Sequence, residues 1–126
     1  MSTPGPALAV SGLTLAIGDV SVVDRIAFSV APGEVMALVG ESGCGKSLTA
    51  QALLCLLPRA VRRTEGRILL EGEDITALSE RRLRGIRGRR ISMIFQEPQA
   101  ALDPLAPVGA QVREASGLPP GEAREA

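Results

Sequence analysis

The segment GESGCGKS, residues 40–47, has the residue types and spacing of a phosphate-binding loop, because it matches the pattern G-x-x-x-x-G-K-[ST] at every fixed position. The glycines at positions 40, 43 and 45 let the backbone take positive φ angles, so that successive N–H groups point into one concavity. A helix that begins near Ser47 adds the partial positive charge of its N-terminus to that concavity. The segment therefore predicts a site for the phosphates of a nucleotide.

The side chains of this loop suggest separate roles. Lys46 is expected to reach the β- and γ-phosphates, and the hydroxyl of Ser47 is expected to bind Mg²⁺. The residues predicted to line the phosphates are Gly40, Glu41, Ser42, Gly43, Cys44, Gly45, Lys46, Ser47 and Leu48. The alternative, a glycine-rich connector that binds nothing, does not account for the lysine and serine at these positions.

The elements around the loop must hold it in place. Val35 to Val39, a short apolar run, predicts a strand buried on both faces, and Ser47 to Leu57 predicts a buried helix that Pro58 ends. Strands are also expected at 7–17, with a kink at Gly12, and at 26–30, before the turn signal Pro32-Gly33. Strand, glycine loop and helix in this order are typical of an α/β fold.

Further elements are expected after this helix. Residues 67–70 predict a strand flanked by Gly66 and Gly72, and residues 91–95 predict another strand. Ser79 is expected to cap a short helix that runs to about Arg87, and residues 108–115 predict a last helix. Residues 1–6 and the last ten residues are expected to be loose.

Composition excludes several classes of function. The chain has no His, which excludes a Ser-His-Asp triad and a His-ligated zinc site, and its two cysteines cannot form a zinc cage alone. The net charge of zero argues against nucleic acid as a partner. The start of the chain has no basic segment, so a secretory signal is not expected. The apolar stretch 48–57 is about half as long as a membrane span.

Three stretches resemble the ATP-binding subunits of ATP-binding-cassette (ABC) transporters. They are FSVAPGEVMALVGESGCGKS, EGRILLEGEDI and RRISMIFQEPQAALDPL, which begin at Phe28, Glu65 and Arg89. The third is most similar to the oligopeptide, dipeptide and nickel importer group. The resemblance spans residues 8–125 and covers about the first half of the family's nucleotide-binding domain. It implies an antiparallel β lead-in and an incomplete RecA-like core, within the P-loop NTPase fold.

The resemblance also implies sites, cofactors and partners. It makes Gln96 the Q-loop glutamine, which contacts Mg²⁺ and the attacking water, so Lys46 and Gln96 are the expected catalytic residues. ATP and Mg²⁺ are the implied cofactors. Membrane-spanning permease subunits and a second ATP-binding subunit are the implied partners, at the cytoplasmic face of the bacterial cell membrane. The implied domains are a partial ATP-binding domain at 7–105 and the start of a helical subdomain at 106–126.

The chain departs from the family pattern in two respects. Ile17 is the nearest candidate for the position where the family stacks adenine on an aromatic residue. No LSGGQ-like signature, no Asp-Glu pair after an apolar strand and no switch histidine occurs in the sequence. Leu78-Ser79-Glu80-Arg81 lacks the glycines of a signature, and Val22-Val23-Asp24 lies upstream of the loop. We therefore expect the 126 residues alone to bind MgATP without turnover, and to expose apolar surface.

Two other hypotheses remain open at this point. One is a catalytically inactive nucleotide-binding or interaction remnant. The other is an unrelated P-loop kinase or GTPase, for which no acceptor or base-recognition motif is present.

Four further features allow a functional and a structural interpretation. The arginine-rich segment 81–90 is expected to be a solvated helix face rather than a nucleic-acid patch, since no aromatic residue is interleaved with it. Contact with a loop of a membrane subunit or with lipid headgroups is the other interpretation. Cys44 is either a reactive thiol or a tolerated small residue, and Cys55 is expected in the core. Glu97 and Asp103 are interpreted as loop carboxylates.

Overall fold

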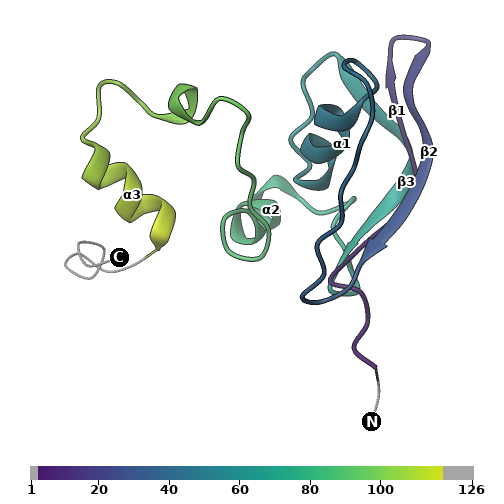
Figure 1. Cartoon of the computed structure of the whole chain (residues 1–126), viewed down its shortest axis with the longest axis horizontal. Coiled ribbons are helices and arrows are strands. Elements are labelled where there is room, and N and C mark those ends of the chain that lie inside the picture. Colours follow the sequence, from purple (N-terminus) through teal and green to yellow (C-terminus); the bar gives the residue numbers. More distant parts are fainter. Residues whose placement is uncertain (1–2, 118–126) are drawn as a thin grey trace. The chain divides into compact units, whose positions relative to one another are not determined.

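The structure, a computed structural model, describes residues 3–117 of the chain (Figure 1). The chain divides into two compact units, Met1–Arg87 and Gly88–Ala126, and each is described by itself. The first unit holds a sheet and two helices, and the second holds a short 3-10 helix, η1 (Pro98–Ala101), and the helix α3 (Val108–Ser116). None of the helices in the described part of the chain has the length and apolar character needed to cross a membrane.

An antiparallel sheet forms the frame of the first unit (Figure 1). Its strands are β1 (Leu8–Ile17), β2 (Val20–Val30), β3 (Val61–Leu70) and β4 (Glu73–Asp74), in the order β2-β1-β3-β4. The strands expected at 7–17, 26–30 and 67–70 are confirmed, although β2 and β3 are longer than the patterns indicate. The buried apolar side chains of these strands include Val10, Leu13, Leu15, Val23, Ile68 and Leu70.

Glycine bends the centre of this sheet. Gly12 has φ +60°, and the register of β1 with both neighbours shifts after Val10 and Ser11, which confirms the expected kink. The sequence predicts that Gly66 flanks this strand, but it lies inside β3, with φ +98°. A Cβ at this position would come within 2.5 Å of the Cα of Leu13. The backbones of β1 and β3 therefore approach each other at a point where only glycine fits.

The helices of the first unit are short. Helix α1 (Lys46–Leu53) begins at the predicted place but ends four residues before Leu57. Only Thr49 and Ala52 are buried within it, so the predicted burial on all sides is wrong. Helix α2 (Glu80–Ile86) is capped by the hydroxyl of Ser79, which accepts from the backbone N–H of Arg82, as predicted. The predicted helix at 108–115 is confirmed as α3.

The two apolar runs expected as core strands are not strands in this structure. Residues 34–40 form no regular element, and Val35 and Val39 are 95% and 85% exposed. In the second unit, residues 92–95 are likewise irregular, and Ile94 is 92% exposed. A strand is stable only when neighbours satisfy its backbone groups, and neither run has such neighbours among residues 3–117. The fold is thus α/β with an antiparallel sheet, and the expected exposure of apolar surface is confirmed.

Candidate phosphate-binding site

The loop of residues 40–47 leads directly into helix α1. Gly43 and Gly45 have φ +81° and +95°, as the motif requires. Gly40 does not have a positive φ, which corrects the expectation for that position. A side chain at Gly40 would instead meet the sulfur of Cys44, whose Sγ lies 2.6 Å from the place of a Cβ. Gly40 therefore lies close to the Cys44 side chain, and a larger residue there would need that exposed side chain to rotate away.

The N-terminus of α1 is open to an anionic ligand. Gly45 is its N-cap residue, and no side chain among the described residues accepts a hydrogen bond at this cap. The N–H groups of the first helical turn have no partner within the helix itself. Uncapped N–H groups and the helix dipole together favour a phosphate group at this end.

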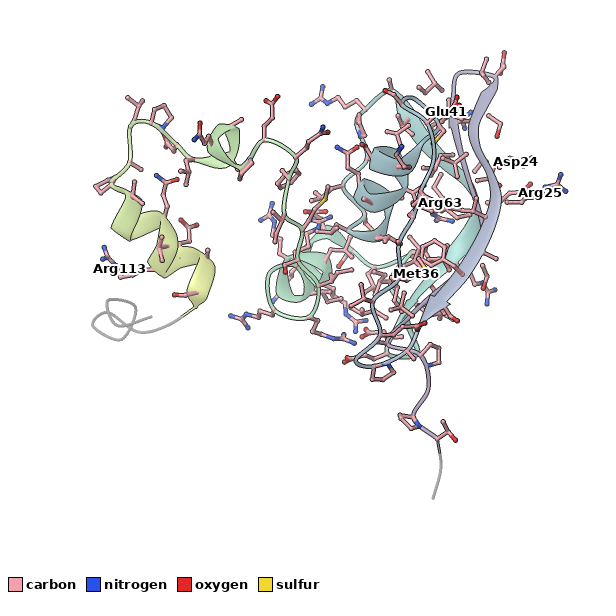
Figure 2. The ribbon with its side chains drawn as sticks, in the orientation of Figure 1. Asp24, Arg25, Met36, Glu41, Arg63 and Arg113 are labelled. Carbon is pink, nitrogen blue, oxygen red and sulfur yellow. The ribbon has the colours of Figure 1, made fainter. Side chains whose placement is uncertain are left out.

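Lys46, the first residue of α1, folds back over the loop. Its Nζ donates to the carbonyl oxygen of Gly40 and, at 3.1 Å, to that of Glu41. Glu41 lies in the loop beside the start of α1, where Figure 2 labels it. The two carbonyl groups hold the ammonium group near the N-terminus of the helix, and an ammonium group donates up to three hydrogen bonds. The geometry thus presents a cation and uncapped N–H groups from one short segment.

A buried threonine forms hydrogen bonds with the last glycine of the loop. Thr49 is 3% exposed, and its hydroxyl donates to the carbonyl oxygen of Gly45 at 2.8 Å. The backbone N–H of Thr49 donates to the same oxygen at 2.9 Å. Sequence reasoning missed Thr49, although a hydroxyl four residues after the motif's last glycine could have suggested this bond.

Strand β2 packs against the last glycine of the loop. A Cβ at Gly45 would come within 2.7 Å of Cγ2 of Val23 and 3.1 Å of the carbonyl oxygen of Val22. These valines belong to the Val22-Val23-Asp24 segment that the sequence analysis set aside, and no local signal connects them to the loop. A cavity of about 200 Å³ between β2 and the loop is lined by Val23, Ile26, Leu38, Val39, Cys44 and Thr49 among others. Asp24 also lines this cavity, and its exposed carboxylate pairs with Arg25 (Figure 2).

The remaining loop residues fit a phosphate ligand with a metal ion. Ser47 is exposed in the first turn of α1, so its hydroxyl is accessible to a metal ion. Leu48, the next residue, is half-buried. No group of three or more acidic, Cys or His side chains in the described ranges could hold a metal ion. Mg²⁺ commonly uses one or two protein oxygens together with phosphate oxygens and water, and a single hydroxyl is compatible with that donor set.

Of the other residues singled out in the sequence, Gln96, Glu97 and Asp103 belong to the second unit, and Ile17 belongs to the same unit as the loop. Gln96 belongs to the second unit, where it is exposed and follows an irregular segment rather than the expected strand. Glu97 is the N-cap residue of η1, and Asp103 accepts a hydrogen bond from the N–H of Leu105. Ile17 ends β1 beside Gly18, at the turn into β2, and is 43% exposed.

The arginine-rich segment and the cysteines are only partly as expected. Arg81, Arg82 and Arg84 are exposed, in agreement with a solvated face, whereas Arg87 is largely enclosed. Cys44 is exposed in the loop. Cys55 is half-buried, and burial raises the pKa of its thiol.

Comparison with known proteins gives one consistent family. Residues 23–116 match the family described as ABC transporter. The chain is 50% identical over 99 residues to the dipeptide transport ATP-binding protein DppD of Bacillus subtilis, which covers 78% of the chain and 30% of that protein. It is 49% identical over 114 residues to the peptidoglycan transport ATP-binding protein YejF of Agrobacterium fabrum, which covers 86% of the chain and 21% of that protein.

Solved structures with a similar fold include an ABC exporter. A bacterial Atm1-family ABC exporter with ATP bound matches with a TM-score of 0.55 and 30% identity, over 70% of this chain and 15% of that one. The chain spans between about 20% and 38% of the length of the curated relatives it matches.

Proposed function

The chain belongs to the ABC transporter family, and on that premise we propose that its phosphate-binding loop holds MgATP. The observation that carries the proposal is the open N-terminus of α1, where Gly45 provides no side-chain cap and Lys46 extends back over the loop. The names of the relatives support ATP as the nucleotide, since they describe ATP-binding proteins of transporters.

We assign the following roles within the loop. The backbone from Gly40 to Leu48 surrounds the phosphates, and Lys46 exchanges its carbonyl partners for oxygens of the β- and γ-phosphates. The hydroxyl of Ser47 would hold Mg²⁺, which would supply positive charge against the phosphates. By the family pattern, Gln96 would contact the metal ion and the attacking water, and its amide has both the donor and the acceptor that this requires.

For the protein to which these residues contribute, we propose ATP hydrolysis that powers import of peptides. The relatives named for dipeptide and oligopeptide transport support this substrate class. The partners are then permease subunits and a second ATP-binding subunit, at the cytoplasmic face of the membrane. The domain limits remain those inferred from the resemblance, with the ATP-binding part at 7–105 and a helical subdomain from 106.

For the 126 residues alone we propose nucleotide binding without turnover. Hydrolysis requires a positioned water and a group that orients it, in addition to a phosphate cradle. The sequence contains the cradle and Gln96, but it has no His and no Asp-Glu pair after an apolar strand. The alternative is a remnant whose task is interaction rather than transport, and it predicts no permease partner.

Equilibrium binding of a fluorescent ATP analogue tests the nucleotide site directly. We expect Mg²⁺-dependent binding to the 126-residue chain, competition by unlabelled ATP and no phosphate release above the no-protein control. Absence of binding would overturn the proposal. Phosphate release that disappears in a Lys46→Ala variant would overturn the statement on turnover. The mass of the native polypeptide, isolated with an antibody to residues 60–90, separates a longer transporter subunit from a remnant of this length.

A further inference from the structure

Helix α1 ends in a left-handed cap that lacks the usual glycine. The N–H of Leu56 donates to the carbonyl oxygen of Gln51 at 3.0 Å, and the N–H of Cys55 donates to that of Ala52 at 2.9 Å. This is the hydrogen-bond pattern of a Schellman motif, in which the left-handed position is held by Cys55 with φ +53°. A non-glycine residue in this conformation raises the free energy of the folded state by about 1 kcal/mol, so neighbouring contacts must offset that cost.

Arg87 makes hydrogen bonds that stabilise this conformation. Its Nε donates to the carbonyl oxygen of Leu54 at 2.8 Å, and one terminal nitrogen donates to the carbonyl oxygen of Cys55 at 2.8 Å. The other terminal nitrogen lies 2.6 Å from Oε1 of Glu80. The side chain is only 15% exposed, although arginine is usually a surface residue. The guanidinium thus joins the C-terminal end of α1 to the first turn of α2.

The charges in this contact agree with its place in the fold. The last carbonyl groups of a helix have no partners within the helix and carry partial negative charge. A guanidinium at this end satisfies two carbonyl groups at once, and Glu80 balances its charge. Arg84 also approaches Glu80, with its Nε 3.8 Å from Oε1, but it is exposed, and within residues 3–117 its side chain makes no hydrogen bond to α1. Arg87 therefore differs from its neighbours in the arginine-rich segment.

We propose that Arg87 is a positioning residue for the phosphate-binding loop, acting through helix α1. This inference rests on the nucleotide binding proposed above. The loop and the Arg87 contact occupy opposite ends of one eight-residue helix, so fixing the C-terminal end against α2 also fixes the direction of the N–H groups at the other end. Displacement of catalytic or binding groups by fractions of an ångström weakens their hydrogen bonds to a ligand.

The first test compares MgATP affinity in three variants of the 126-residue chain. Arg87→Ala is expected to weaken binding about tenfold, because the helix end loses hydrogen bonds to a charged group. Arg87→Lys keeps the charge but not the planar fork that spans two carbonyl groups, so an intermediate loss is expected. Arg84→Ala removes a neighbouring arginine that does not reach α1, and its affinity is expected to stay within about twofold of the wild type.

The second measurement follows the thiol of Cys55 and separates positioning from general stability. Trypsin cleaves after Lys46, so Cys44 and Cys55 fall on different peptides, residues 26–46 and 47–59, and their alkylation rates can be measured together. In the wild type, MgATP is expected to slow alkylation of Cys55. In Arg87→Ala, alkylation without nucleotide is expected to be about tenfold faster, and MgATP is expected to give no protection.

Each outcome decides the proposal. If the wild type fails to bind MgATP, the proposed function is wrong. If the wild type binds and a folded Arg87→Ala variant binds equally well, the positioning role is wrong and the function stands. If Arg87→Ala does not fold, Arg87→Lys decides: weaker binding by a folded protein supports positioning, and unchanged binding and Cys55 alkylation overturn it. If neither variant folds, Arg87 holds the whole unit, and the narrower role is overturned.

Discussion

The ammonium group of Lys46 donates to the carbonyl oxygen of Glu41 at 3.1 Å, so the lysine closes over the loop that precedes it. The same group donates to the carbonyl oxygen of Gly40. These bonds keep the cation beside the uncapped N-terminus of α1. The position of Lys46 is thus set by the chain itself.

Replacing Lys46 by Ala is expected to weaken MgATP binding by about 100-fold or more, since each hydrogen bond from a charged group contributes about 1.5–3 kcal/mol. Equilibrium titration with a fluorescent ATP analogue measures this loss. Arg81→Ala is the control, because Arg81 is an exposed cation of α2 outside the loop. An equal loss in both variants would show that general charge, rather than Lys46, attracts the nucleotide.

Gly45→Ala is expected to destabilise both the loop and the fold. An added Cβ would meet Val23 Cγ2 at 2.7 Å, and the residue would keep φ +95°. We expect a loss of about 2–4 kcal/mol in the free energy of unfolding. Gly43→Ala is the matched comparison: it has φ +81° but nothing within 4 Å, so only the backbone cost of about 1–2 kcal/mol applies. Urea unfolding of both variants compares them, and equal losses would contradict the contact with Val23.

Thr49→Val is expected to lower the free energy of unfolding by about 1 kcal/mol, because the buried site loses the hydroxyl that donates to Gly45. Thr49→Ser retains the hydroxyl and should keep the hydrogen bond. Nucleotide affinity is expected to fall in the valine variant and to stay close to that of the wild type in the serine variant. A serine variant that loses as much affinity as the valine variant would assign the effect to packing.

Gly66→Ala is expected to prevent β1 and β3 from pairing. The new Cβ would lie 2.5 Å from the Cα of Leu13 and 2.7 Å from the carbonyl carbon of Gly12, all of it backbone that side-chain rotation cannot move. We expect a loss above about 4 kcal/mol in the free energy of unfolding, or no folded protein. Gly72→Ala, in open space with φ +84°, is expected to cost about 1–2 kcal/mol. Thermal unfolding by circular dichroism distinguishes them.

The pair of Glu80 and Arg87 gives the stability a defined dependence on pH. The hydrogen bond from Arg87 holds the pKa of the Glu80 carboxyl below its ordinary value of 4.5. A carboxyl with a lowered folded-state pKa stabilises the fold above its unfolded-state pKa, and this contribution is lost as the pH falls through the folded-state pKa. Glu80→Gln should therefore lower the Tm at about pH 7, and the difference from the wild type should shrink as the pH falls below the unfolded-state pKa. A pH-independent difference in Tm would contradict the ion pair.

The sequence predicts the local parts of this fold well. The residues of the loop, the kink at Gly12, the cap at Ser79 and the last helix all follow from short patterns, because each depends on neighbours a few residues away. The run Val35 to Val39 is different, since an apolar run becomes a strand only when distant segments pair with it. The local pattern carries no information on whether such partners are in place.

The supporting residues of the site were also beyond a local pattern. Arg87 stands among other arginines, and nothing in its neighbourhood distinguishes the side chain that reaches Leu54, 33 positions away. Val23 contacts the site through Gly45 only because β2 and the loop meet in the folded unit. The sequence therefore predicts groups that would touch a ligand, whereas the groups that support the loop come from contacts between distant segments.

The close approach of β1 and β3 at Gly66 limits the substitutions that this sequence can accept during evolution. A change at Gly66 is expected to remove folded protein from the cell, because unfolded chains are degraded, whereas a change at Lys46 is expected to lower nucleotide binding far more than the amount of protein. A survey of variants scored by abundance would find Gly66 among the least replaceable positions and Lys46 among the neutral ones. The same survey scored by nucleotide binding would find both, and the difference between the two maps would separate the positions that selection retains for the fold from those retained for the ligand.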